Sequence, residues 1–232
     1  MEKYLERELD RLRQQVLTMA SHTESAVSLA MQALLERDPE LALSIKENDR
    51  IIDRFEIEID NEVMRLLTKA PLAANLRLVT VCMKISQNFE RIGDEASKIA
   101  GRARDLCWEP PLRLELDLPR LGGLARDMLK AALDAFSQRD PIAARAVIPR
   151  DAEVNEINHQ IHAALVRHMM ENPDTIGRCL HWLVVSKSLE RIADHATNVA
   201  EYVIYCCEAR DIRLTSRTAT APAGTPAAAV MG

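Results

Sequence analysis

The chain has 232 residues, of which 47% are hydrophobic and 28% charged, enough for one large domain or two small ones. Only 7 glycines and 3% aromatic residues argue against a β-sandwich or barrel, because those folds need frequent turn residues and aromatic or β-branched strands. The formal net charge is −5 and no Lys/Arg cluster dominates, so nucleic-acid binding is not expected.

The sequence predicts neither membrane insertion nor secretion. No stretch approaches the roughly 20 apolar residues that span a bilayer. The N-terminal segment MEKYLERELDRLRQQV is charged throughout and lacks the apolar region of a signal peptide, which favours a cytoplasmic protein. The five cysteines are odd in number and form no Cys-x-x-Cys pair, so reduced thiols are expected.

Three amphipathic helices are predicted in the first half. In the first helix, mostly apolar residues recur at intervals that alternate between four and three, which places them along one face of the helix. These residues are Leu5, Leu9, Leu12, Val16, Met19, Thr23, Ala26, Ala30 and Ala33. Asp38-Pro39 combines an N-cap residue with a proline suited to the first helical position, so a second helix begins there and ends near Pro71. A third helix is expected from about residue 72 to residue 107.

The second half repeats this organisation. Trp108-Glu109-Pro110-Pro111 breaks the helical pattern, which predicts a three-helix repeat over residues 1–108, a linker over 109–117 and a second repeat over 118–210. Asp140-Pro141 repeats the helix-start signal, and Pro149 predicts a kink or a late start in the fifth helix. Residues 211–232 are rich in Thr, Ala and Pro and are expected to be disordered. The predicted fold is all-α, with six helices in two tandem three-helix bundles.

Two segments a hundred residues apart indicate an internal duplication. Residues 86–100 read SQNFERIGDEASKIA and residues 186–200 read SKSLERIADHATNVA, with Ser, Glu, Arg, Ile, Asp and two Ala in common. A weaker match, at an offset of 102, aligns the second helix with the fifth.

The duplication retains two pairs of acids, Glu90 with Asp94 and Glu190 with Asp194. The i, i+4 spacing places both carboxylates of a pair on one helical face, about 6 Å apart and roughly 140–180° from the apolar stripe. An outward pair of this kind suits a hard cation such as Mg²⁺, Ca²⁺, Mn²⁺ or iron. A solvated surface, with the neighbouring Arg91 and Arg191 as salt-bridge partners, is the alternative that the residues leave open.

Residues flanking the apolar stripes of the second and fifth helices could reach these pairs. They are Asp49, Asp53 and Asp60 in the second helix, matched by Asp151, Asn155 and His162 in the fifth. His195 either extends the second site as an imidazole ligand or is a polar surface histidine. The sequence contains no glycine-rich phosphate loop, nucleophile elbow or HExxH motif, so an enzyme is poorly supported.

The paired Glu-Arg-Ile-Gly/Ala-Asp motifs resemble those of the PhoU family of phosphate-uptake regulators. Residues 189–201 read LERIADHATNVAE, close to the LERIGDHATNIAE that is common in the family, and residues 89–96 read FERIGDEA. The resemblance spans roughly residues 3–210. It implies metal clusters of the kind that some members of the family hold on the bundle surface, with iron or zinc expected first and Mg²⁺ or Mn²⁺ as alternatives.

The resemblance assigns ligands residue by residue. One site would use Glu90 and Asp94 with Asp49 and Asp53, and the other would use Glu190, Asp194 and Asp151. Asn155 stands where the family has an Asp. Because an amide is a weaker ligand than a carboxylate, the second site is expected to bind less tightly or to select another metal.

The resemblance also implies a function without catalysis. The protein would be a negatively regulating adaptor, often a homodimer, between the ATPase subunit of the phosphate ABC transporter and the phosphate-responsive sensor histidine kinase. It would restrain phosphate uptake and the starvation response when phosphate is plentiful. Three alternatives stay open: a superfamily relative that accompanies a low-affinity phosphate permease, a dinuclear-metal enzyme, and a purely structural bundle.

Overall fold

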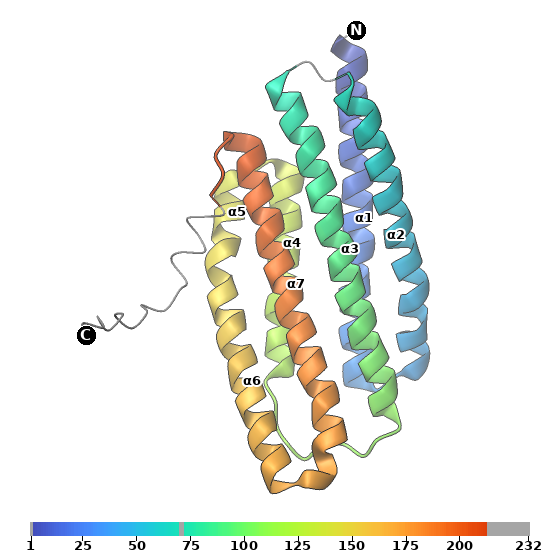
Figure 1. Ribbon diagram of the computed structural model, residues 1–232, viewed down its shortest axis with the longest axis vertical. Coiled ribbons are helices and arrows are strands. Elements are labelled where there is room, and N and C mark those ends of the chain that lie inside the picture. The colour runs from blue at the N-terminus through green and yellow to red at the C-terminus, as the bar shows by residue number, and fades with distance from the viewer. Residues whose placement is uncertain (1, 70–71, 213–232) are drawn as a thin grey trace, which may run out of the picture.

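The computed structural model describes residues 2–69 and 72–212. The first half of this part consists of α1 (Glu2–Glu36), α2 (Pro39–Leu67) and α3 (Ala73–Cys107), and the second half of α4 (Leu118–Gln138), α5 (Pro141–Val147), α6 (Asp151–Glu171) and α7 (Ile176–Glu208) (Figure 1). The prediction of an all-α fold with two three-helix units is confirmed, with the expected fifth helix divided into α5 and α6. None of the helices in the described ranges has an apolar stretch of the length that a bilayer crossing requires.

The Asp-Pro signals begin helices in both halves. Asp38 and Asp140 each accept hydrogen bonds, of 2.8–3.1 Å, from the backbone N–H groups two and three residues further on. Immediately before these caps, Arg37 and Arg139 adopt the left-handed backbone conformation, with φ of 56° and 54°, and end α1 and α4. The same three-residue sequence, Arg-Asp-Pro, therefore turns the chain at equivalent places in the two halves.

Pro149 divides the expected fifth helix in two. A 3-10 turn, Ile148–Arg150, joins α5 to α6. Proline lacks the N–H that would continue the α-helical bonding and its ring crowds the preceding turn, which accounts for the interruption. The predicted kink is therefore present, and it sets the start of α6 at Asp151, one of the expected ligands.

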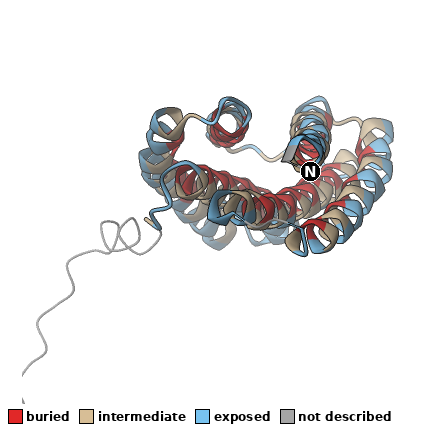
Figure 2. Ribbon diagram, turned by 90° about the horizontal axis from the view of Figure 1, so that it is seen from above, coloured by how far each residue is buried: buried red, intermediate tan, exposed pale blue. Residues whose placement is uncertain are grey.

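The helices form two layers around one continuous core. Seen from above, α2, α3, α7 and α6 make a curved layer, and α1 and α4 cover its inner side (Figure 2). Their facing stripes are fully buried, and examples are Leu12, Met19, Ile52, Phe89, Ile92, Leu121 and Met128. Helices α3 and α7 lie antiparallel at the centre and join the two halves (Figure 1). The acid-bearing motif of each half therefore lies on a central, well-packed helix.

The segment between the halves is anchored to the core. Residues 108–117 are non-helical, and Leu112, Leu114 and Leu116 pack against the buried cluster. Arg178 of α7 donates hydrogen bonds to the carbonyl oxygens of Pro110 and Pro111 in this segment. Beyond α7, only residues 211 and 212 of the predicted disordered tail belong to the described residues, and residues 213–232 lie outside them.

Candidate functional site

The acid pairs lie where the repeat predicts, on the outer surface of the central helices. Glu90 and Asp94 are half-buried on α3, and Glu190 and Asp194 are half-buried and exposed, respectively, on α7. Helix α2 packs against α3 and helix α6 against α7, so each pair has a neighbouring helix that supplies further acids. We call the surface around the first pair the α2–α3 acid face and the surface around the second the α6–α7 acid face.

A small residue inside the motif brings α2 close to α3. A Cβ atom at Gly93 would lie 3.0 Å from Cδ1 of Ile52 and 3.5 Å from Oδ1 of Asp49. This close approach sets Asp49 against the α3 acids. Burial raises the pKa of Asp49, a contact with the Ser97 hydroxyl opposes the rise, and the charges of Asp53 and Asp94 add to it. Three of the expected ligands are thus brought together.

The other side of the α2–α3 acid face contains an acid that was not predicted. Burial and the nearby Asp94 carboxylate raise the pKa of Glu90, with smaller repulsive contributions from Glu56 and Asp53. Burial and the acids around it, Asp60 and Asp53 first, likewise raise the pKa of Glu56. Glu56 and Glu90 line a depression of about 320 Å³ on this face. Helical spacing from Asp53 and Asp60 could have revealed Glu56, because residues three and four apart share a face.

The α6–α7 acid face is built around two carboxyl groups that share a hydrogen bond. Although Asp194 is exposed as a residue, its carboxyl group lies against Asp151. Burial of that group, the charges of Asp151 and Glu190, and the hydrogen bond to Asp151 raise the pKa of Asp194 to about 7. Burial also raises the pKa of Asp151, although the hydrogen bonds from Asp194 and Asn155 oppose the rise. Asn155 Nδ2 lies 2.9 Å from Asp151 Oδ2. Asn155, which stands where the family has an Asp, therefore donates a hydrogen bond to Asp151. An Asp at this position would instead repel the three carboxylates already present.

A lysine and a histidine complete the surroundings of Glu190. Lys187 forms an ion pair with Glu190, one helical turn away on α7. His162 of α6 lies close enough to both for Lys187 to lower its pKa, in addition to burial, and for Glu190 to oppose that change. Nε2 of His162 is buried and has no hydrogen-bond partner among the described residues. The imidazole is thus an available nitrogen ligand beside the α6–α7 acid face.

His195 belongs to a different part of the molecule. Its Nδ1 atom lies 2.9 Å from Oδ1 of Asn88 on α3, and the charges that act on it are those of Glu95, Arg91, Arg191 and Lys98. The suggestion that His195 extends the second metal site is therefore wrong, and so is the alternative of a solvated surface histidine. Its ring is half-buried in the α3–α7 interface.

The motif arginines differ in their partners. Arg91 Nε lies 3.3 Å from the adjacent Glu90 carboxylate, as the salt-bridge alternative predicts. Arg191 instead lies 3.2 Å from Glu95 across the α3–α7 interface. The motif therefore supports both the acid faces and the junction between the halves.

The donor set fits a hard cation, although the side chains do not already form a cage. Crowded carboxylates with raised pKa values are stabilised by positive charge. Asp60 Oδ1 and Asp151 Oδ1 are also buried without a hydrogen-bond partner in the described part of the chain. In residues 2–69 and 72–212, no three His, Cys, Asp or Glu side chains already converge on one point in a way that could hold an ion. Binding would therefore require these carboxylates to rotate toward a common centre.

A hydroxyl group is a second feature that the sequence reasoning missed. Ser97 and Thr197 occupy equivalent positions of the repeat, one helical turn after Gly93 and Ala193. Both hydroxyl oxygens are buried and make no hydrogen bond of ordinary length with the described residues, although Ser97 lies near enough to Asp49 to oppose the rise in its pKa. The sequence did contain a signal for this feature. The first copy of the repeat has Ser and the second has Thr at this position, so both copies keep a hydroxyl group.

Comparison with known proteins places this arrangement in a family. The family model of the PhoU domain matches the chain twice, over residues 16–103 and 118–203, one match for each half. The chain belongs to the PhoU family. Similar relatives are described as phosphate-specific transport system accessory protein PhoU homologues. One from Zymomonas mobilis is 36% identical over 90% of this chain and 89% of the relative, and one from Pseudomonas putida is 39% identical over 89% and 81%.

Solved PhoU structures share the fold. The crystal structure of PhoU from Pseudomonas aeruginosa superposes with a TM-score of 0.86 at 38% identity, covering 88% of this chain and 99% of that one. A phosphate transport system regulatory protein PhoU from Streptococcus pneumoniae superposes with a TM-score of 0.83 at 26% identity, covering 89% and 98%. The whole described fold, and not only the two motifs, is therefore PhoU-like.

Proposed function

We propose that the protein is a regulatory adaptor of phosphate transport that restrains phosphate uptake and phosphate-starvation signalling. Its relatives are accessory proteins of the phosphate-specific transport system, and the Streptococcus pneumoniae relative is a regulator of phosphate transport. The proposed action is binding, not catalysis, in the cytoplasm and as a homodimer.

One observation of the structure carries the adaptor mechanism. Two equivalent acid faces are held on one core, because α3 and α7 pack directly against each other. A rigid body with two such faces can contact two partners at once. We propose that these partners are the ATPase subunit of the phosphate ABC transporter and the phosphate-responsive sensor histidine kinase.

Metal ions are the proposed cofactors of the acid faces. The residues that would hold them are Glu90, Asp94, Asp49 and Asp53 in the first half and Glu190, Asp194 and Asp151 in the second. Iron or zinc is proposed first, with Mg²⁺ or Mn²⁺ as alternatives. The chemistry that a bound cation supplies is neutralisation of the mutual carboxylate repulsion. The chain's own residues orient the carboxylates and present the completed face to a partner.

Deletion of the gene, with alkaline phosphatase assayed in phosphate-rich medium, tests the regulatory role. We expect constitutive expression that the intact gene represses again. Repressed output in the deletion strain would contradict negative regulation and favour the permease companion or an enzyme. Affinity capture from the complemented strain then identifies the partner, because the adaptor should recover the ATPase subunit and a permease companion should recover the permease.

The acid faces are tested in the same strain. The pairs Glu90→Ala/Asp94→Ala and Glu190→Ala/Asp194→Ala should each fail to restore repression at normal protein levels. The matched control is Asp127→Ala/Asp134→Ala, which removes the same charge from the exposed side of α4 and should restore it. Full complementation by a variant that lacks all four paired acids would favour the purely structural bundle.

A further inference from the structure

The two acid faces carry different amounts of negative charge. Six carboxylates act on one another on the α2–α3 acid face, and they are Asp49, Asp53, Glu56, Asp60, Glu90 and Asp94. The repeat keeps three of them on the α6–α7 acid face, as Asp151, Glu190 and Asp194, and replaces the others by Asn155, Asn158 and His162. A divalent cation is therefore attracted more strongly to the first face than to the second.

Two of the three acids on the α6–α7 acid face have partners within that face. Asp151 and Asp194 share a hydrogen bond, and Asn155 donates a further one to Asp151 at 2.9 Å. Asn158, which replaces an acid of the first half, accepts a hydrogen bond from the buried Ser186 hydroxyl. These contacts leave one acid of the face, on α7, to be neutralised.

That acid is neutralised by a lysine of its own helix. Lys187 forms an ion pair with Glu190, three residues further along α7. Burial lowers the pKa of His162 and Lys187 adds to the effect, while Lys187 opposes the rise that burial produces in the pKa of Asp194. The ammonium group thus lies near three groups of the face. A positive charge is already present where a metal ion would bind.

The equivalent position of the first half has no charge. Gln87 corresponds to Lys187 at the repeat offset of 100. It lines the depression of about 320 Å³ on the α2–α3 acid face, together with Glu56 and Glu90. A lysine at position 87 would therefore stand beside Glu90 as Lys187 stands beside Glu190.

Arg91 does not replace the missing lysine. It contacts Glu90 from the adjacent position of α3, at 3.3 Å, and its side chain is 65% exposed. Asp49, on the facing helix, is influenced chiefly by burial, the Ser97 hydroxyl and two further acids. Asp60 Oδ1 is buried without a hydrogen-bond partner among the described residues. The carboxylates between α2 and α3 therefore retain negative charge that an added cation can neutralise.

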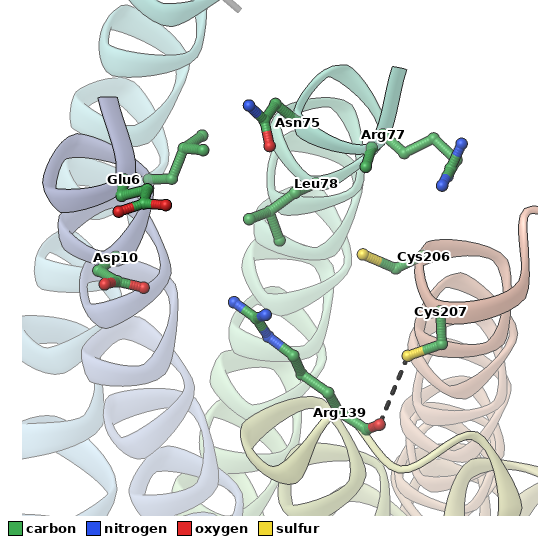
Figure 3. A pocket seen from close by; sticks show the side chains of 10 residues that line it. Glu6, Asp10, Asn75, Arg77, Leu78, Arg139, Cys206 and Cys207 are labelled. Atoms are coloured by element: carbon green, nitrogen blue, oxygen red, sulfur yellow. Dashed lines mark hydrogen bonds between the residues drawn. The ribbon is translucent and has the colours of Figure 1, made fainter. Parts of the chain in front are cut away.

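A pocket apart from both faces also contains acids. It is formed where α1 and α3 begin and α4 and α7 end (Figure 3). Glu6 and Asp10 line its α1 side, and the Arg139 side chain extends toward them from the end of α4 (Figure 3). Because a guanidinium group repels a second cation, this pocket is a poor competitor of the α2–α3 acid face for a divalent ion.

We propose that Lys187 is a tethered counter-ion that keeps the α6–α7 acid face closed to divalent cations, while the α2–α3 acid face binds them. This inference rests on the proposed binding of metal by the acid faces and gives the two faces unequal roles. The ammonium group competes with a metal ion, since both need the carboxylate oxygens of Glu190. The two partners of the adaptor would then meet different surfaces, one completed by metal and one by the chain's own lysine.

Mn²⁺ binding to the metal-free full chain tests the proposal, with the free ion measured by electron paramagnetic resonance. Wild type should show one high-affinity class of sites, which Glu90→Ala/Asp94→Ala removes. In that double variant, Lys187→Gln should strengthen the remaining weak binding about tenfold. Lys187→Met, which also removes the charge but supplies no oxygen ligand, should have the same effect. The matched control is Lys130→Gln, which removes an exposed lysine from α4 and should change nothing.

The reverse substitution tests the first half. Gln87→Lys places an ammonium group beside Glu90 and should weaken the high-affinity class about tenfold. Gln138→Lys adds the same charge at an exposed position of α4 and is the matched control, which should bind as wild type does. Circular dichroism and the Tm confirm that each variant is folded.

The outcomes separate this inference from the proposed metal binding itself. Two classes of equal affinity in wild type, or unchanged binding in both Lys187 variants, would overturn the role of Lys187 and leave metal binding by the acid faces intact. Failure of wild type to bind either Mn²⁺ or Zn²⁺ at concentrations up to about 1 mM would overturn both. The readout is ion binding by the isolated protein, so it does not depend on the gene-deletion experiment.

Discussion

The Ser188 hydroxyl of α7 donates a hydrogen bond of 2.7 Å to the Glu95 carboxylate of α3, and the residues one repeat away from both, Asn88 and His195, lie in contact at 2.9 Å. A contact between positions 95 and 188 that recurs between positions 195 and 88 is the signature of a twofold relation between the two helices. The duplication thus built an internal interface with the reciprocity of a homodimer. The two halves have since diverged, as the equivalent positions 95 and 195 show: one holds a glutamate and the other a histidine.

Loss of the Glu95 side chain should destabilise the junction between the halves. Glu95 is 4% exposed and accepts hydrogen bonds from Ser188, Arg191 and Lys98. We expect Glu95→Ala to cost about 2–3 kcal/mol of the free energy of unfolding, since the acceptor of a buried, charge-assisted network is removed. The surface-exposed ends of Arg191 and Lys98 keep the cost below that of a fully buried ion pair. Urea unfolding measures it, and a loss under about 0.5 kcal/mol would contradict the network's importance.

The pH dependence of this network has a definite sign. Burial would raise the pKa of Glu95, but the hydrogen bonds from Lys98, Ser188 and Arg191 outweigh burial and lower it from its ordinary value of 4.5. The stabilisation is therefore present above pH 4.5 and is lost as the pH falls below it. The difference in the free energy of unfolding between wild type and Glu95→Ala should shrink at pH 3.5 relative to pH 6.

His195 should make the protein less stable at mildly acidic pH. Burial, together with Arg91, Arg191 and Lys98, lowers its pKa from the ordinary value of 6.5, against the opposing charge of Glu95. The unfolded chain then binds the proton more strongly than the folded chain, so stability falls as the pH drops below about 6.5. In chelator-treated protein, His195→Gln should lose less of its Tm between pH 7.5 and pH 5.5 than wild type does. An equal loss in the two proteins would assign the effect to other groups.

Local features of the fold could be predicted from sequence, and contacts between helices could not. The Asp-Pro starts, the interruption at Pro149 and the outward direction of the acid pairs follow from capping and helical period, which depend on a few neighbouring residues. The position of His195 depends on which helix faces α7, and a single helix pattern carries no such information. Arg37 and Arg139 demonstrate the limit clearly, since the same Arg-Asp-Pro sequence places one side chain on carbonyl oxygens and the other in a pocket.

Asp194 should respond to pH in the opposite direction from His195. Burial and the neighbouring Asp151 and Glu190 raise its pKa to about 7, from an ordinary 3.8. The folded chain retains a proton that the unfolded chain releases, so its stabilisation is full below about pH 4 and is lost as the pH rises through 7. In chelator-treated protein, the Tm advantage of Asp194→Asn over wild type should grow from pH 5 to pH 8. Asp151→Asn, which removes the coupled carboxyl, should reduce this growth, and a constant advantage would contradict the assigned coupling.

Exchange of the residues at positions 53 and 155 should exchange the metal affinities of the two acid faces. Asn155→Asp adds a carboxylate to the α6–α7 acid face and removes a donor from Asp151. The metal-free protein should therefore lose stability, while the affinity of that face for Mn²⁺ or Zn²⁺ should rise about tenfold. The reciprocal Asp53→Asn should weaken the α2–α3 acid face by a similar factor. Competition against a chelating dye measures both, and unchanged affinities would remove these two positions from the ligand set.

The repeat supplies its own control for the arginine at each left-handed turn. The Arg37 side chain donates to the carbonyl oxygens of Leu106, Cys107 and Glu109, and so ties the α1–α2 turn to the end of α3. Arg37→Ala leaves those carbonyl groups without this donor and should cost about 1–2 kcal/mol of the free energy of unfolding. Arg139→Ala removes the same side chain from the same backbone conformation, but no hydrogen bond to the described residues is lost, so its cost should be under about 0.5 kcal/mol. Urea unfolding of the two variants compares them directly. Equal costs would mean that the Arg139 side chain is as important to stability as the Arg37 side chain, in spite of its lack of hydrogen bonds to the described residues.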